Sequence, residues 1–319
     1  MSQRGLHDEG ALARHMPGSA LDQGDIRFTI QDEPADVIVV LNYLQYDTRL
    51  TARRGFIWNW HNEPIVRTPF AKGFDRIFTH FSSTDIRAVT APPLLDWWID
   101  KSYDELVQMA PPVKTAKLSV ISSTKEMIEG HKVRNRFVNS LEQSSLEISV
   151  FGEGRSNRLT DKWDGLGPFE FSVAIENTSK QDYWTEKISD CFLSFTVPLY
   201  FGATNLDEYF PKDSYIWLPL QSEQSAITTI EKALDEESWM DRVQALTEAR
   251  RRVLENYSLF GQLASRVRFE AENIRNSDFT TKKVHGRRIR KGGWIRGKGL
   301  RGNIQAWRRK ASARRSSIA

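Results

Sequence analysis

The 319-residue chain contains one cysteine, Cys191, so no disulfide bond can form within it. A protein without disulfides suits a reducing compartment. The chain also lacks any run of about 18 apolar residues, which excludes a conventional membrane-spanning helix. Its first 25 residues are polar and lack the pattern of a secretory signal. We therefore expect a cytoplasmic protein.

Two patterns of metal chemistry are missing as well. No Asp-x-Asp motif, a common chelator of divalent cations in proteins, occurs in the chain. The six histidines show no spacing typical of metal ligands. We expect neither a metal site nor a resident cofactor.

Acidic residues are absent from the end of the chain. Residues 281–319 hold 14 of the 45 lysines and arginines and none of the 41 acidic residues, which leaves 31 basic and 41 acidic side chains in residues 1–280. Such a block is typical of a solvated or partner-binding tail. Its glycines disfavour a helix. The tryptophans and isoleucines among the basic residues suit an anionic membrane surface or nucleic acid, and a solubilising tail is the remaining alternative.

The rest of the chain alternates predicted strands with predicted helices, which indicates parallel sheets. Apolar runs predict strands at 36–42, 55–60, 74–80, 117–122, 146–151, 169–175, 197–201 and 215–218. We expect helices at 94–109, along the face of Val133, Phe137 and Leu141, and from Thr185 as N-cap. The length predicts two domains. We place them at 1–110 and 117–274, with a proline-containing linker at 111–116 and a basic tail at 275–319.

Open parallel sheets bind ligands beyond the carboxyl ends of their strands. The loops after Ser122, Ile175 and Phe201 should therefore line one crevice. Two of these loops lead into helix N-termini, where free N–H groups favour anions, so we expect a diphosphate there.

Three segments carry a family resemblance. Residues 175–202 read IENTSKQDYWTEKISDCFLSFTVPLYFG, residues 117–141 place Arg134-Asn135 in a helix, and Asn62-Glu63-Pro64 follows a tryptophan-rich strand. The first segment resembles the donor-binding signature of the α1,3/1,4-fucosyltransferases, glycosyltransferase family 10, bacterial type. The other two resemble that family's arginine-containing helix and its acceptor-side acidic motif.

The resemblance implies a GT-B fold, with two Rossmann-like domains facing a central cleft, and an inverting transfer of fucose from GDP-fucose that needs no metal. Arg134 and Lys187 would bind the diphosphate. Glu186 would accept hydrogen bonds from donor hydroxyls, Asn177 and Tyr183 would complete the pocket, and Glu63 would be the general base.

The resemblance also implies partners. The acceptor would be a glycan, such as a lipid-linked or lipopolysaccharide-type oligosaccharide, receiving an α1,3-type linkage. Residues 281–315 would hold the protein on the inner face of a membrane, and we expect no nucleic acid as partner. Three alternatives stay open: a related transferase for another nucleotide sugar, an inactive family member, and a nucleic-acid-binding protein.

Overall fold

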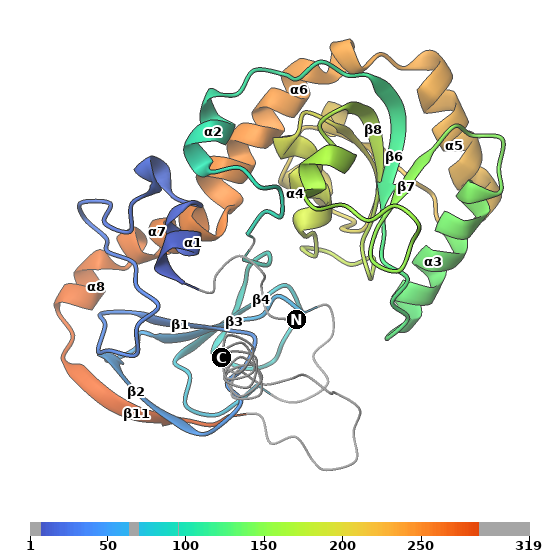
Figure 1. Cartoon of the computed structure of the whole chain (residues 1–319). Helices are drawn as coiled ribbons and strands as arrows, with labels where there is room; N and C mark the ends of the chain where they lie inside the picture. The colour runs from blue at the N-terminus through green and yellow to red at the C-terminus, as the bar shows by residue number, and fades with distance from the viewer. Residues whose placement is uncertain (1–7, 64–69, 95, 287–319) are drawn as a thin grey trace, which may run out of the picture.

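The computed structural model describes residues 8–63, 70–94 and 96–286, which form two α/β domains (Figure 1). The N-terminal domain has a sheet of four parallel strands in the order β1–β3–β4–β5. Their bounds are β1 Ile38–Leu41, β3 Ile57–Trp60, β4 Arg76–Thr79 and β5 Ala88–Thr90. The first three lie inside predicted apolar runs, because a parallel strand covered on both faces needs continuous apolar sequence.

The second domain has five parallel strands in the order β10–β9–β8–β6–β7. Their bounds are β6 Ala116–Ile121, β7 Ser149–Phe151, β8 Phe169–Ile175, β9 Val197–Phe201 and β10 Ile216–Trp217. In the central strand, Phe171 is paired with Leu118 of β6 on one side and Val197 of β9 on the other. Its helices are α3 Glu129–Glu142, α4 Glu186–Leu193, α5 Glu223–Glu236 and α6 Trp239–Arg252, with short 3-10 turns at Lys162–Gly165, Leu206–Glu208 and Lys212–Ser214.

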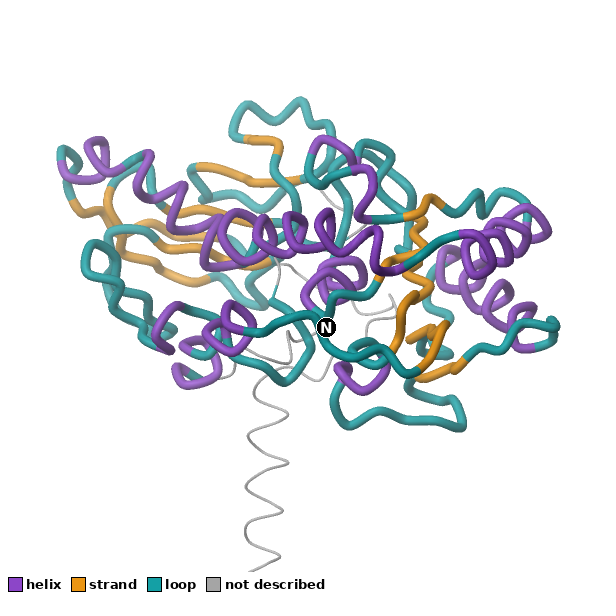
Figure 2. Tube along the Cα trace, turned by 90° about the horizontal axis from the view of Figure 1, so that it is seen from above, coloured by secondary structure: helices purple, strands orange, loops and turns teal. Residues whose placement is uncertain are grey.

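Two parallel-sheet domains with a cleft between them confirm the predicted fold class. Viewed from above, the strands gather in separate groups and helical segments run between them (Figure 2). The larger apolar core lies in the second domain. In the N-terminal domain the core includes Leu12, from the short helix α1 Glu9–Ala13, and Met16, the N-cap of the 3-10 turn Pro17–Ser19.

The helix predicted at 94–109 is wrong in its first half. The structure has only α2, Tyr103–Gln108, which Ser102 and Glu105 begin with a reciprocal capping box. Before it, the backbone N–H groups of Trp98 and Asp100 donate to side-chain carboxylates and not to helical carbonyls. Trp97, Ile99 and Leu106 pack in the core of the second domain, so the chain crosses between domains before the predicted linker.

The chain then returns to the N-terminal domain at its end. A π-helical turn, Val253–Tyr257, follows α6 and precedes α7 Leu259–Phe269 and α8 Ala271–Arg275. Leu259, Leu263 and Ile274 join the N-terminal core. The last strand, β11 Phe279–Val284, pairs antiparallel with β2 Thr48–Arg53.

The basic tail therefore begins later than predicted. Residues 279–284 alternate between outward and inward positions, with Val284 fully buried. Their lysines are not free tail charges, because Lys282 pairs with Asp75 and Lys283 pairs with Asp47 at 2.9 Å. The rest of the predicted tail, 287–319, lies outside the described residues.

Candidate active site

A cavity of about 860 Å³ lies between the two domains. All six residues singled out from the sequence line it, with Glu63 from the N-terminal domain and the other five from the second domain: Arg134, Asn177, Tyr183, Glu186 and Lys187. The loops after β6 and β8 contribute to the wall, as the parallel-sheet rule requires. The structure thus brings the predicted residues together.

The third predicted loop, after Phe201, contributes no residue to this wall among those described. Instead it contacts the segment that forms the wall, from the side away from the cavity. Asn205 accepts a hydrogen bond from the Asp182 N–H at 2.9 Å, and the Gly202 carbonyl accepts one from Ser179 at 2.8 Å. This loop therefore supports the segment that carries Asn177 and Tyr183, because its bonds fix that backbone from behind.

Arg134 is buried in the second turn of α3. Its Nη1 donates to Asn177 Oδ1 at 2.8 Å and its Nη2 donates to the Ser123 carbonyl at 3.3 Å, whereas its buried Nε has no partner. Burial lowers the pKa of this guanidinium, against the opposing effect of Glu176. Two hydrogen bonds therefore fix the position of the guanidinium, and its Nη atoms each keep a second N–H for another acceptor.

The start of α3 approaches the Asn177 loop very closely. A Cβ atom at Gly130 would lie 1.9 Å from the Asn177 carbonyl oxygen, so this contact requires glycine. The N-cap residue, Ile128, offers no side-chain hydrogen bond to the first turn. Free N–H groups at a helix start favour an anion.

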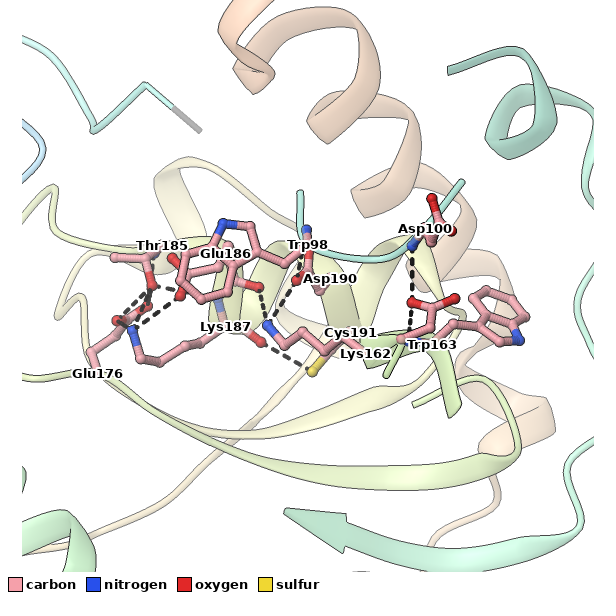
Figure 3. Close-up of polar contacts among 11 residues, drawn as sticks. Trp98, Asp100, Lys162, Trp163, Glu176, Thr185, Glu186, Lys187, Asp190 and Cys191 are labelled. Carbon is pink, nitrogen blue, oxygen red and sulfur yellow. Dashed lines mark hydrogen bonds and ion pairs between the residues drawn. The ribbon is translucent and has the colours of Figure 1, made fainter. Parts of the chain in front are cut away.

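A buried carboxylate holds the start of α4. Glu176, at the end of β8, accepts hydrogen bonds from the Thr185 N–H at 2.7 Å, from the Thr185 hydroxyl and from Lys187 Nζ at 3.2 Å (Figure 3). Thr185 is the predicted N-cap of this helix, and its side chain accepts from the Lys187 N–H. Burial raises the pKa of Glu176, and Lys187 opposes that shift.

Lys187 therefore already has a partner. Besides Glu176 its ammonium contacts Thr185 Oγ1 at 3.0 Å and Glu186 Oε1 at 3.6 Å. Burial lowers its pKa, but the two carboxylates outweigh burial and the net pKa is raised. The pKa of Glu186 is lowered: burial raises it, and Lys187 and Lys162 together prevail. Both side chains stay ionised at neutral pH.

Tyr183 forms a contact between the two domains. Its buried ring lies 4.8 Å from the ring of His80, which follows β4. Burial raises the pKa of its hydroxyl well above the ordinary value, with further contributions from Glu176, Glu186 and Glu63. The last contribution places the Glu63 carboxylate in the same electrostatic environment as the five residues of the second domain.

The position of Glu63 is set by Asn62. Asn62 donates to the Leu94 carbonyl at 2.8 Å and accepts from the Leu94 N–H at 2.9 Å, and its own N–H donates to Asn42 Oδ1. Pro64, the neighbour of Glu63 on the other side, lies outside the described residues. Asn62 supplies the constraint among the described residues.

The sequence reasoning missed a second buried ion pair. Lys162 donates to Asp190 Oδ2 at 2.7 Å and to the Glu186 carbonyl at 3.3 Å. Burial raises the pKa of Asp190 to about 6, against the effect of Lys162. One signal was available: Asp190 lies among Ile188, Cys191 and Phe192 in the buried part of α4, and a buried carboxylate needs a partner.

The wall also contains basic side chains that the sequence did not single out: Lys125, His131, Arg158 and Lys162. Burial lowers the pKa of His131 to about 4, with Arg134, Lys187 and Lys125 adding to the effect. Cationic groups repel a further proton, so this histidine is neutral at pH 7. The wall also carries six carboxylates: Glu63, Asp96, Asp100, Glu153, Asp161 and Glu186. The part that suits an anionic ligand is the one around His131, where Arg134, Lys187 and Lys125 lie.

Two Rossmann-like α/β domains that face each other across a cleft form the GT-B arrangement, and this arrangement defines the class of fold. Within that class, residues 112–239 match the family model "Glycosyltransferase family 10 (fucosyltransferase) C-term". The resemblance predicted from the sequence is thereby confirmed over this segment. It contains all five donor-side residues, whereas Glu63 falls outside it.

Curated relatives give the same family. A putative fucosyltransferase-like protein of Arabidopsis thaliana is 27% identical over 46% of this chain and 27% of its own length. A 4-galactosyl-N-acetylglucosaminide 3-alpha-L-fucosyltransferase 9 of Bos taurus is 26% identical over 56% of this chain and 49% of its own length. The chain thus spans about half or less of these relatives.

Two crystal structures of alpha1,3-fucosyltransferase are also similar. One, with GDP-fucose, shares 16% identity and a TM-score of 0.47 over 83% of this chain and 96% of that chain. The other, with GDP, shares 19% identity and a TM-score of 0.47 over 74% of this chain and 84% of that chain.

Proposed function

We propose that this chain transfers fucose from GDP-fucose to a hydroxyl group of a glycan. The observation that carries the proposal is the convergence of Arg134, Asn177, Tyr183, Glu186 and Lys187 on one wall of the interdomain cavity, with Glu63 on the opposite domain. Cations on one side and a carboxylate on the other suit a reaction in which a diphosphate leaves and a hydroxyl attacks.

The donor diphosphate would lie against Arg134 and the start of α3. Each Nη atom of the guanidinium has a second N–H besides the one bonded to Asn177 or Ser123, and these groups and the uncapped helix start would donate to phosphate oxygens. Lys187 would share its charge between Glu176 and the leaving group. The ionised Glu186 would accept hydrogen bonds from ribose or fucose hydroxyls, and the Tyr183 ring would close the pocket.

The proposed chemistry is a single displacement. The acceptor oxygen attacks the anomeric carbon of fucose, the bond from that carbon to the β-phosphate oxygen breaks, and the acceptor proton passes to the Glu63 carboxylate. GDP leaves with both electrons of the broken bond. Attack from the opposite face would convert a β-linked donor into an α-linked product. The cations of the wall would stabilise the leaving charge without a divalent metal.

The acceptor is inferred from the relatives. The name of the Bos taurus relative specifies a 4-galactosyl-N-acetylglucosaminide and a 3-alpha linkage, and we propose a glycan of this kind, including lipid-linked or lipopolysaccharide-type forms. No helix among residues 8–63, 70–94 and 96–286 has the length and apolarity to cross a membrane. We further propose that the basic residues beyond β11, 287–315, bind an anionic membrane surface from the cytoplasmic side.

A donor-hydrolysis and transfer assay tests the proposal. Purified protein is incubated with GDP-fucose, GDP-mannose or a UDP-sugar, with and without an N-acetyllactosamine glycoside, and again in EDTA. We expect turnover of GDP-fucose alone, an α-linked product by NMR and full activity in EDTA. Turnover of a different donor would point to the related transferase, and turnover of none would point to an inactive member. Activity that is lost in EDTA and restored by a divalent ion would overturn metal independence.

A further inference from the structure

Trp98 is the one large aromatic side chain of the cavity wall that is substantially exposed among the described residues. Its exposed fraction is 40%, whereas its neighbour Trp97 is 4% exposed. Trp97 stacks on His15 at 4.4 Å and donates its indole N–H to the Lys101 carbonyl, which accounts for its burial. Trp98 is not covered in this way, and leaving a large apolar ring in water costs free energy, so its exposure calls for an explanation.

The backbone of Trp98 is held from the second domain. Its N–H lies 3.2 Å from both carboxylate oxygens of Asp190 on α4, and the Asp100 N–H donates to Asp161 at 2.9 Å (Figure 3). Asp190 is itself fixed by Lys162, whose ammonium lies 5.7 Å from the centre of the Trp98 ring. An exposed indole on a clamped backbone is preorganised for binding.

The same segment is tied to the candidate base. Asn62, next to Glu63, makes the reciprocal pair of hydrogen bonds to the Leu94 backbone, four residues before Trp98. Lys162, beneath Trp98, also bonds to the backbone of Glu186 on the donor side. Trp98 is therefore linked to both walls of the cavity. In the proposed reaction the acceptor hydroxyl has to reach the base and the donor at once, so the acceptor sugar would lie at this junction.

We propose that Trp98 is a stacking platform for a sugar ring of the acceptor glycan, an inference that rests on the proposed function. Pyranose rings present a face of C–H bonds, and an indole buries that face while the hydroxyls stay free for polar contacts. The wall beside it offers such contacts from charged side chains. Trp98 touches substrate but moves no proton, so it governs acceptor affinity rather than chemistry.

Steady-state kinetics with GDP-fucose and an N-acetyllactosamine glycoside test this platform. Trp98→Ala should raise the acceptor KM about tenfold or more and leave kcat within about threefold, with GDP affinity and the KM for GDP-fucose unchanged. Trp98→Phe should keep most of the affinity. Phe269→Ala removes a ring that is 78% exposed and lies outside the cavity, so it is the matched control and should behave like wild type.

An unchanged acceptor KM in Trp98→Ala would overturn the proposal. A loss confined to GDP-fucose would assign the ring to the donor sugar and also overturn it. Saturation-transfer NMR of the glycoside with wild type and Trp98→Ala, in the presence of GDP, separates the inference from the proposed function. Trp98-dependent glycan binding without any transfer would sustain the platform and reject the transferase activity. Transfer of fucose with glycan binding that does not depend on Trp98 would support the transferase activity and reject the platform.

Discussion

Arg134 combines a fixed position with unused donor capacity, which is unusual for a buried guanidinium. Asn177 and the Ser123 carbonyl hold two of its nitrogens, and its buried Nε has no partner. In the proposed donor complex, the second N–H group on each Nη atom would bind the anion, and a hydrogen bond to a charged group is among the strong ones.

Arg134→Ala should therefore weaken GDP binding about tenfold to a hundredfold, at roughly 1.5–3 kcal/mol for a charged hydrogen bond. Arg136→Ala is the control, because Arg136 lies on the same helix and pairs with Glu223 at the surface. Titration calorimetry measures both affinities. Equal binding by wild type and Arg134→Ala would remove Arg134 from the donor site.

Lys187 has two roles that can be separated by mutation. Lys187→Ala should weaken GDP binding and also destabilise the fold by about 3–5 kcal/mol, because Glu176 is left buried without its counter-charge. The double change Glu176→Gln with Lys187→Met should recover most of the stability but not the GDP affinity. Urea unfolding and calorimetry measure the two effects.

The surface pair Lys232–Glu236 supplies the control for that experiment. Both side chains are more than 60% exposed, so Lys232→Ala should change stability by less than about 1 kcal/mol. Recovery of GDP affinity in the double variant would show that Lys187 holds the helix start and does not contact the ligand.

Glu63 is the residue on which the chemistry depends. Glu63→Gln should lower kcat by about 10²–10⁴-fold and leave GDP affinity nearly unchanged, because the amide keeps the shape of the side chain but cannot take a proton. Glu33→Gln, at an exposed position, should retain full turnover. Near-normal kcat in Glu63→Gln would mean that the base must be sought elsewhere in the N-terminal loops.

At the level of elements, the sequence predicted the strands whose burial requires apolar residues. Strands β1, β3, β4, β6, β8 and β9 appear as apolar runs, and Thr185 was recognisable as an N-cap because of its hydroxyl. The apolar residues of segment 94–101 predict a helix, but α2 begins only at Tyr103. The backbone N–H groups of this segment instead bond to Asp161 and Asp190, about 60 and 90 residues away. Local pattern cannot reveal such distant partners.

The same limit applies to the site. Motifs in the sequence mark Arg134, Glu186 and Lys187. No sequence pattern connects Lys162 with Asp190, because the two residues lie in separate segments that only the fold brings together. β11 was missed because its two lysines resemble the basic run that follows. Only the pairing with β2 shows that they belong to a strand.

The contact between β4 and the donor loop should make the fold sensitive to acid. Burial lowers the pKa of His80 to about 4, with smaller opposing effects from the His61 backbone and Asp182 and supporting effects from His61 and Lys180. Between pH 6.5 and 4 the unfolded chain therefore binds a proton that the folded chain does not. Stability is full above pH 6.5 and falls with pH through this window, by about 2 kcal/mol per such histidine at pH 5.

His80→Phe should remove about 2 kcal/mol of the loss of stability that wild type suffers between pH 7.5 and pH 5. His131 adds a similar loss, whereas Asp190, with its raised pKa, acts in the opposite direction. Urea unfolding at the two pH values measures the difference. An identical pH dependence in His80→Phe would show that this ring does not titrate as described.

Across the whole molecule, the end of the chain has two parts with different tasks. Residues 259–284 complete the N-terminal domain through Leu259, Leu263 and Ile274 in its core and through β11 in its second sheet. The residues beyond 286 carry most of the basic charge of the tail.

A chain ending at residue 286 should therefore keep the unfolding temperature of the full protein and its affinity for GDP. A chain ending at residue 278 should lose several degrees, because β2 loses its partner strand and the site of buried Val284 is emptied. Calorimetry measures both. Sedimentation with phosphatidylglycerol vesicles, beside neutral vesicles, should show binding by the full chain and not by either truncation. Equal binding by all three would refute the membrane role of the tail.

The return of the chain to its first domain has a consequence for synthesis on the ribosome. The first domain has all the strands of its parallel sheet by residue 90, but its core lacks α7 and β2 lacks its partner until residue 284 has left the ribosome. At roughly 5–20 residues per second, this interval lasts about 10–40 s. The second domain, complete within residues 97–254, can fold first. The usual order of domain folding is thereby reversed, and the newly made chain keeps an open sheet exposed until its last helices arrive.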